Sequence, residues 1–249
     1  MLSFRRITVR LLALFALSGF GGAALSARNT AEKPANVDAG SFGIFVRGQR
    51  VATETFRIQQ GATVSTATSE FKMEQGETKV AHRSELQITT AGDLRHYEWR
   101  ELSPGKAQLV VEPSDSFLVE RIIPNPPEKP IQRPFTLPAS TMILDDYCFS
   151  HREILAWRYL AQVCGNNLAQ CRPAPTQFGV LAPQQRSSLT VTIEYTGLQK
   201  VAIRGTEQQL SQFRLKIDDV EWMLYLDGSL KLIRISIPTE ETEIVRDPS

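Results

Sequence analysis

The residues best able to do chemistry lie in one short stretch, ILDDYCFSHREIL, at positions 143–155. It holds Asp145, Asp146, His151 and Glu153 within nine residues. Carboxylates beside an imidazole are the side chains of general acid–base catalysis and of many metal sites. One hypothesis is therefore a hydrolase in which these four residues form the active site.

The spacing of these residues along a helix argues against that hypothesis. At about 100° per residue, His151 lies about 140° around the helix from Asp146. Side chains that share a proton or a metal on one helix are three or four residues apart. The simpler interpretation is that Asp145 or Asp146 caps a helix over about 146–163, by accepting hydrogen bonds from its first amides.

The rest of the expected helix is largely apolar. A helix this apolar must be buried on more than one side, and the concave face of a curved sheet is the natural place for it. His151, Arg158 and Gln162 lie within about 40° of one another and form a polar stripe, which we expect to face solvent or the mouth of a cleft.

Aromatic residues on an expected strand are further candidates. Tyr97 and Trp99 alternate with His96 and Glu98, a pattern that fits both a ligand surface and an ordinary half-buried strand. The three histidines are scattered, and the sequence has no phosphate-binding glycine loop, nucleophile elbow or H-E-x-x-H motif. We therefore expect no metal, no cofactor and no catalytic residue. The candidate ligand-binding residues are Tyr97, Trp99, His151, Trp157 and Arg158.

Three cysteines are present, and an odd number allows one internal disulfide and one free thiol. If residues 146–163 are helical, Cys148 and Cys164 are about 24 Å apart along the axis, beyond disulfide reach. Cys164 and Cys171 flank the turn-rich loop GNNLAQ. We predict a Cys164–Cys171 disulfide and a buried, unreactive Cys148.

Most of the chain after position 41 has the pattern of short strands and turns. Residues 189–195 alternate strictly between apolar and polar side chains, and Asp227-Gly228 suits a two-residue type I′ turn inside a hairpin at 221–237. The fold class expected is mainly β: a curved antiparallel sheet or open barrel of about 11–12 strands, with one buried helix. Residues 124–140 hold six of the 14 prolines and are expected to form a stiff connector inside a single domain at 41–246.

The first 27 residues have the layout of a secretory signal peptide. Arg5, Arg6 and Arg10 precede an apolar run that is too short and too rich in glycine to span a membrane. Residues 28–40 are expected to form a flexible lead-in. Without the signal peptide the chain carries 25 basic and 27 acidic residues, so nothing in its charge favours nucleic acid. We expect a periplasmic or secreted protein, peripheral to the membrane at most.

Two stretches carry a resemblance to a known family. GIFVRGQRVATETFRI, which begins at Gly43, and WMLYLDGSL, which begins at Trp222, resemble the opening and closing hairpins of a domain-of-unknown-function family of exported bacterial β-rich proteins. The order of elements is also similar to the lipoprotein-carrier fold, an open half-barrel around a helix. The resemblance implies an extracytoplasmic β fold and supplies no catalytic residues.

Three functions follow as hypotheses. The first is a non-enzymatic cell-envelope protein that binds a lipid or another apolar ligand in the concave face of the sheet. The second is an envelope hydrolase that uses Asp145, Asp146, His151 and Glu153. The third is a structural partner that docks on another envelope protein through a sheet edge.

Overall fold

A computed structural model describes residues 34–73, 75, 79–126, 128–165, 168 and 171–248. The predicted signal peptide at 1–27 and the first part of the predicted lead-in lie outside these residues. The strands of the N-terminal half are β1 (Ala35–Val46), β2 (Gln49–Gln60), β3 (Val64–Met73), β4 (Ala81–Thr89), β5 (Leu94–Ser103), β6 (Gln108–Ser114), β7 (Phe117–Ile123) and β8 (Ile131–Phe135).

The C-terminal half contains the α-helix of the described chain, α1 (Ser150–Val163), and two single 3₁₀ turns, η2 (Pro183–Gln185) and η3 (Pro238–Glu240). Its strands are β9 (Met142–Ile143), β10 (Thr176–Ala182), β11 (Ser187–Ile203), β12 (Thr206–Ile217), β13 (Val220–Leu226), β14 (Leu232–Ile237) and β15 (Thr242–Arg246).

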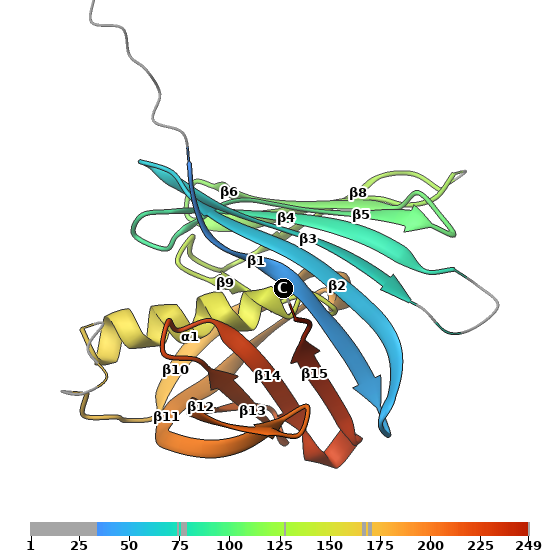
Figure 1. Cartoon of the computed structure of the whole chain (residues 1–249). Helices are drawn as coiled ribbons and strands as arrows, with labels where there is room; N and C mark the ends of the chain where they lie inside the picture. The colour runs from blue at the N-terminus through green and yellow to red at the C-terminus, as the bar shows by residue number, and fades with distance from the viewer. Residues whose placement is uncertain are drawn as a thin grey trace, which may run out of the picture. The chain divides into compact units, whose positions relative to one another are not determined.

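The 15 strands of the described residues belong to one sheet, in the order β8-β7-β6-β5-β4-β3-β2-β1-β15-β14-β13-β12-β11-β10-β9. Each half is a meander of neighbouring antiparallel strands, and among these strands only the short β9–β10 pair is parallel. Antiparallel pairing of β1 with β15 joins the two halves. The sheet curves so strongly that β3–β8 and β10–β14 lie on opposite sides of α1 (Figure 1). It does not close, because β8 and β9 remain its two edges.

Alternation along the strands decides which side chains face the helix. In β2 the buried positions are Ala52, Glu54, Phe56 and Ile58, while the residues between them are more exposed. The same period of two runs through the other strands and gives the sheet an apolar inner face. Leu155 and Leu160 of α1 are buried against that face and form the centre of one large core.

Two hairpins have two-residue turns in which both residues have positive φ. Arg47 and Gly48 connect β1 to β2 with φ of 51° and 76°, and Arg204 and Gly205 connect β11 to β12 with φ of 51° and 82°. Glycine at the second position makes these angles accessible without a steric penalty. The distal half of the β11–β12 hairpin carries a second, smaller apolar cluster of Val201, Ile203 and Leu210.

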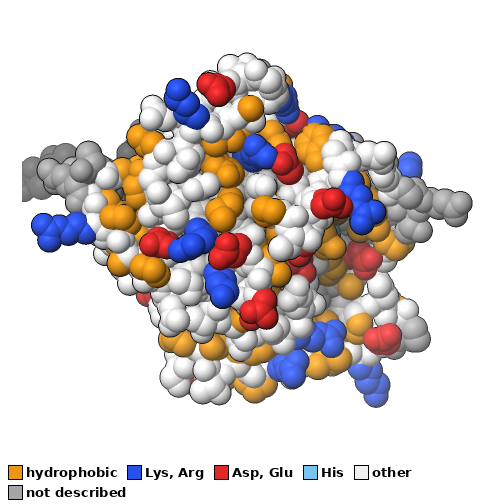
Figure 2. Space-filling model, turned by 90° about the horizontal axis from the view of Figure 1, so that it is seen from below, with side chains coloured by type: hydrophobic (Ala, Val, Ile, Leu, Met, Phe, Trp, Pro, Cys, Tyr) orange, Lys and Arg blue, Asp and Glu red, His pale blue; other side chains and the backbone are white. Residues whose placement is uncertain are grey.

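The outer surface mixes side chains of all kinds. On the face shown in Figure 2, basic, acidic and hydrophobic side chains are interspersed, and neither sign of charge gathers in one region. A surface of this kind sets up no strong field of one sign.

The expected fold class is confirmed, with differences in detail. The sheet has 15 strands instead of 11–12. The predicted flexible lead-in is partly wrong, because β1 already begins at Ala35 and pairs there with β2. The proline-rich connector is also not entirely irregular: its residues Ile131–Phe135 form β8, an edge strand in which Pro134 needs no ladder partner on its free side.

The cysteines are arranged as predicted. Cys164 and Cys171 form a disulfide across a separation of seven residues, and Cys148 is free and buried. None of the helices in the described part of the chain has the length and hydropathy required to cross a bilayer. The disulfide is compatible with the predicted secretion of the protein.

Candidate functional site

A carboxylate from the sheet holds the first turn of α1. Glu54 of β2 is fully buried and accepts hydrogen bonds from the backbone amide of Phe149 at 2.8 Å and the hydroxyl of Ser150 at 2.9 Å. The hydroxyl of Ser69 donates to the same carboxylate at 2.8 Å. Burial raises the pKa of Glu54, and these hydrogen bonds oppose the rise. Glu54 therefore caps the helix from 95 residues away in sequence.

The predicted cap by Asp145 or Asp146 is wrong, because the chain reverses between these residues and the helix. Tyr147 has a φ of 60°, which a helix does not allow, so α1 begins only at Ser150. Asp145 instead accepts a hydrogen bond of 2.6 Å from the hydroxyl of Tyr97 and one of 3.1 Å from the backbone amide of Gln184. Burial raises the pKa of Asp145 to about 6.

His151 does not lie on a solvent-facing stripe, which corrects a second prediction. Its side chain is in the core, with its ring edge-on to Tyr97 at 5.8 Å between centroids. Burial lowers its pKa to about 3, and the neighbouring guanidinium of Arg152 adds to the effect. The Nδ1 atom has no hydrogen-bond partner among the described residues. His151 is therefore a neutral core residue at physiological pH.

Glu153 belongs to another group of buried charges. It lies beside Asp38 of β1, which the side chains of Arg246 and Lys231 contact at 2.6 and 3.1 Å. Burial and the neighbouring carboxylate of Asp38 raise the pKa of Glu153 to about 9. At neutral pH Glu153 is thus protonated, and the carboxylate of Asp38 beside it keeps its charge.

The four residues of the hydrolase hypothesis therefore do not converge. Asp145 contacts Tyr97, the carboxylate of Asp146 accepts from Gln185 at 2.7 Å, and Glu153 pairs with Asp38. The described residues also contain no group of three or more His, Cys, Asp or Glu side chains placed to hold a metal ion. This arrangement does not favour catalysis at the ILDDYCFSHREIL stretch.

A cleft of about 560 Å³ opens beside the N-terminal end of α1. Side chains from β1–β3 form one wall and side chains from β10–β13 form the other, while residues 144–149 and η3 complete it. Most of its lining is aliphatic or aromatic, including Ile44, Phe71, Phe149, Val180 and Trp222. The size and the apolar lining are typical of sites for small ligands. We call it the Arg152 cleft.

Arg152 is the basic side chain that lines this cleft. Its exposed fraction is 2 %, and one of its terminal nitrogens donates to the backbone carbonyls of Asp145 at 2.5 Å and Cys148 at 3.0 Å. Its guanidinium lies over the rings of Trp222 and Phe149, at 4.9 and 5.7 Å from their centroids.

No carboxylate contacts Arg152, although those of Asp146, Glu54 and Asp145 lie near enough to favour its charged form. Among the described residues it forms no ion pair with a carboxylate, and its Nε atom has no hydrogen-bond acceptor. Burial lowers its pKa, but a guanidinium remains protonated at neutral pH. A buried cation without an ion pair at contact distance is costly, and an anionic group in the cleft would supply that contact.

The five predicted ligand-binding residues do not lie together in one site. Trp157 and Arg158 line a smaller cavity of about 370 Å³ on another part of the helix. Both are tied to backbone carbonyls, Trp157 to Leu230 at 2.6 Å and Arg158 to Gly92 at 2.8 Å. Tyr97 and His151 touch each other in the core, and Trp99 lies 5.6 Å from the ring of His82. None of the five lines the Arg152 cleft.

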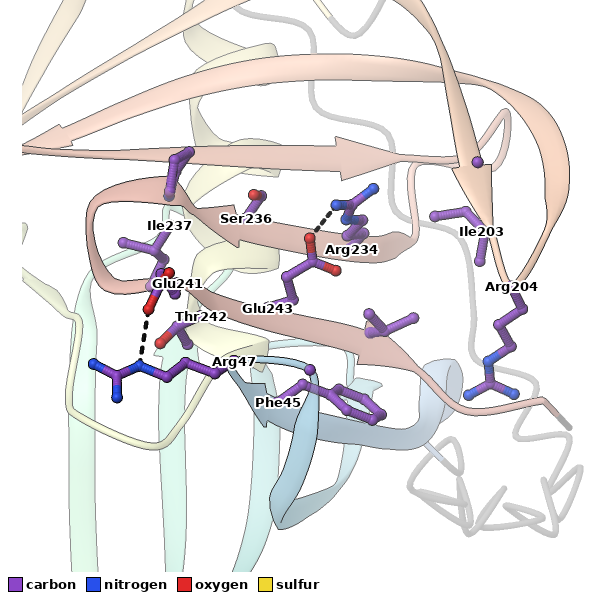
Figure 3. Close-up of a pocket in the computed structure, with 14 residues that line it drawn as sticks. Phe45, Arg47, Ile203, Arg204, Arg234, Ser236, Ile237, Glu241, Thr242 and Glu243 are labelled. Atoms are coloured by element: carbon purple, nitrogen blue, oxygen red, sulfur yellow. Dashed lines mark hydrogen bonds and ion pairs between the residues drawn. The ribbon is translucent and has the colours of Figure 1, made fainter.

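A third hollow of about 540 Å³ lies on the outer face of the sheet. It is bounded by the tip of the β11–β12 hairpin and by β14, β15 and β1 (Figure 3). Its basic side chains are paired: Arg47 with Glu241 at 2.8 Å, Arg204 with Asp247 at 3.0 Å, and Arg234 with Glu243. Its charges are therefore satisfied within the protein, unlike that of Arg152. The Arg152 cleft is the better candidate site for this reason, although the volumes are similar.

Sequence reasoning missed Glu54 and Arg152, but each leaves a signal. Glu54 lies on the inward-facing side of β2, where the other buried residues are apolar. Arg152 is a cation in the first turn of a helix, where the macrodipole disfavours positive charge. A charged residue that breaks a local rule in this way marks a position whose partner lies elsewhere in the fold.

Comparisons of the chain with protein-family models, with curated proteins and with solved structures found no match.

Proposed function

We propose that this is a non-enzymatic protein of the cell envelope that binds an amphiphile in the Arg152 cleft. The apolar chain of the ligand contacts the aliphatic and aromatic walls, and an acidic end group pairs with Arg152. The observation that carries the proposal is the buried guanidinium of Arg152, which has no carboxylate partner among the described residues and lines a mainly apolar cleft.

Two energetic terms support this class of ligand. Burial of an alkyl chain against the walls is favourable by about 0.8 kcal/mol per methylene group. An anionic group that hydrogen-bonds to a buried guanidinium gains a charge-assisted interaction, and it removes the cost of leaving that cation unpaired. The similarity to lipoprotein carriers remains a prediction, and the proposal does not depend on it.

Calorimetric titration of the mature protein tests the proposal with three ligands of equal chain length. Dodecanoate is expected to bind more tightly than dodecanol, and dodecyltrimethylammonium is expected to bind most weakly. The difference between acid and alcohol should be about tenfold or more, since hydrogen bonds to charged groups contribute about 1.5–3 kcal/mol. Equal affinities for the acid and the alcohol would show that no buried cation recognises the ligand.

Two arginine variants locate the site. Arg152→Met should remove the preference for the acid, whereas Arg158→Met, the same change in the smaller cavity, should leave it intact. Because Arg152 also holds the carbonyls of Asp145 and Cys148, its variant is compared by the ratio of acid to alcohol affinity and not by affinity alone. A preference lost only in Arg158→Met would move the site to the smaller cavity.

A further inference from the structure

The Arg152 cleft has a second electrostatic feature, at its acidic side chains. Its charged lining residues are Arg152 and three carboxylates, Asp146, Asp218 and Glu240. Asp218 and Glu240 are exposed and Asp146 is partly exposed, whereas Arg152 is almost fully buried. The cleft is thus positive at its buried end and negative where it meets solvent.

None of the three carboxylates forms an ion pair within the described part of the chain. Asp146 accepts a hydrogen bond from the amide of Gln185, which carries no charge. Asp218 lies in the two-residue turn between β12 and β13, with a φ of 51°, and Glu240 ends η3. Asp146 also lies near enough to Arg152 to favour its charged form. Three separate elements therefore bring negative charge to one cleft, and no basic side chain of the described residues contacts it.

We infer that the ligand of the Arg152 cleft carries a cationic group at its outer end as well as an acidic group at its inner end. This inference rests on the proposed function. The ligand it describes is an aliphatic chain with an acidic group at one end and an ammonium or guanidinium group at the other. The inner group pairs with Arg152, and the outer group lies among Asp146, Asp218 and Glu240.

Exposed apolar side chains around the same cleft agree with a chain that runs from the interior to solvent. Val46, Met73 and Tyr147 are exposed large hydrophobic residues, and all three line the cleft. They give the outer part of an alkyl chain apolar contacts before it reaches the carboxylates. A peptide suits this lining less well, because few polar side chains are present to satisfy its backbone amides.

A set of chains that differ only at the outer end tests the inference. Dodecanoates with an ω-amino, an ω-hydroxy or an ω-carboxy group are titrated into the mature protein at low ionic strength. The ω-amino acid should bind about fivefold more tightly than the ω-hydroxy acid, as expected for partly exposed ion pairs, and the ω-carboxy acid should bind more weakly than either. The advantage should shrink in high salt.

Matched variants assign the effect to the carboxylates. The double change Asp218→Asn and Glu240→Gln should abolish the amino advantage, and asparagine tolerates the positive φ of position 218. Glu207→Gln, an exposed position outside the cleft, should retain the advantage.

The outcomes separate this inference from the proposed function. If dodecanoate binds with its acid preference but the ω-amino group adds nothing over the ω-hydroxy group, the inference fails and the proposed function stands. If dodecanoate does not bind, both fail. An amino advantage that persists in the double variant would also overturn the inference, because the carboxylates would not be its cause.

Discussion

An arginine in the first turn of a helix opposes the helix macrodipole, and Arg152 is tolerated there because of its neighbours. Glu54 places a carboxylate at the same helix end, and the rings of Trp222 and Phe149 face the guanidinium. These contacts come from β2, from β13 and from the preceding loop, so they depend on the fold. Local spacing could therefore predict the helix but not the partners of its first turn. His151, the conspicuous residue of that turn, is a neutral core side chain instead.

Glu153 provides a prediction at the residue scale, since burial and Asp38 raise its pKa from 4.5 to about 9. The native state then binds more protons than the unfolded state between these values, so stability should fall as the pH rises from about 4.5 to about 9. Glu153→Gln removes the titration and keeps the size and the neutral state of the protonated side chain. Its melting temperature should match that of the parent near pH 4.5 and fall less than that of the parent as the pH rises from 4.5 to 9.

The control for this experiment is Glu194→Gln, which changes a partly exposed glutamate paired with Arg214. Its pH profile should run parallel to that of the parent. Glu153→Ala also lacks the titration, but it should be less stable than Glu153→Gln at every pH, by about 2 kcal/mol, because it leaves a cavity. Parallel profiles for the parent and Glu153→Gln would contradict the assignment of a protonated Glu153.

At the scale of elements, the helix and several hairpins were predictable because their signals are local. The alternating residues 189–195 form part of β11, and the apolar residues from Ile154 onward belong to α1. The boundaries were less predictable. The turn expected at Asp227-Gly228 is a longer loop in which the carboxylate of Asp227 accepts from two backbone amides and Leu230 has the positive φ. That loop presents the carbonyl of Leu230 to Trp157, a tertiary contact without a local signal.

The cap from Glu54 gives a prediction about the helix as an element. Glu54→Ala leaves the amide of Phe149 and the hydroxyls of Ser69 and Ser150 without their acceptor. Unsatisfied buried groups of this kind cost about 1–3 kcal/mol each before relaxation, so chemical denaturation should show a loss of about 3 kcal/mol.

The matched change for that experiment is Glu70→Ala on β3, which removes a surface carboxylate paired with Lys72. It should alter stability by no more than about 0.5 kcal/mol. If both variants lose equally little, α1 does not depend on a cap from the sheet.

At the scale of the whole described chain, the β class was predictable from composition and alternation, and the order of the strands in the sheet was not. Residues 242–246, at the end of the expected domain, form β15 in the middle of the sheet between β14 and β1. β8 lies within the proline-rich segment, and β9 has two residues, too few for a periodic signal. The pairing of β1 with β15 brings the ends of the domain together and helps to form the Arg152 cleft between the two halves.

The central claim is that a buried cation in this cleft binds an acidic end group, and carbon NMR of carboxyl-labelled dodecanoate tests it directly. The carboxyl resonance of the bound ligand reports its pKa as the pH is lowered. Pairing with Arg152 predicts a bound pKa below that of the free acid in water, and a higher one in Arg152→Met, where the same carboxyl is desolvated without a counter-ion. A bound carboxyl whose pKa is raised in the parent protein, and unchanged in Arg152→Met, would contradict the account.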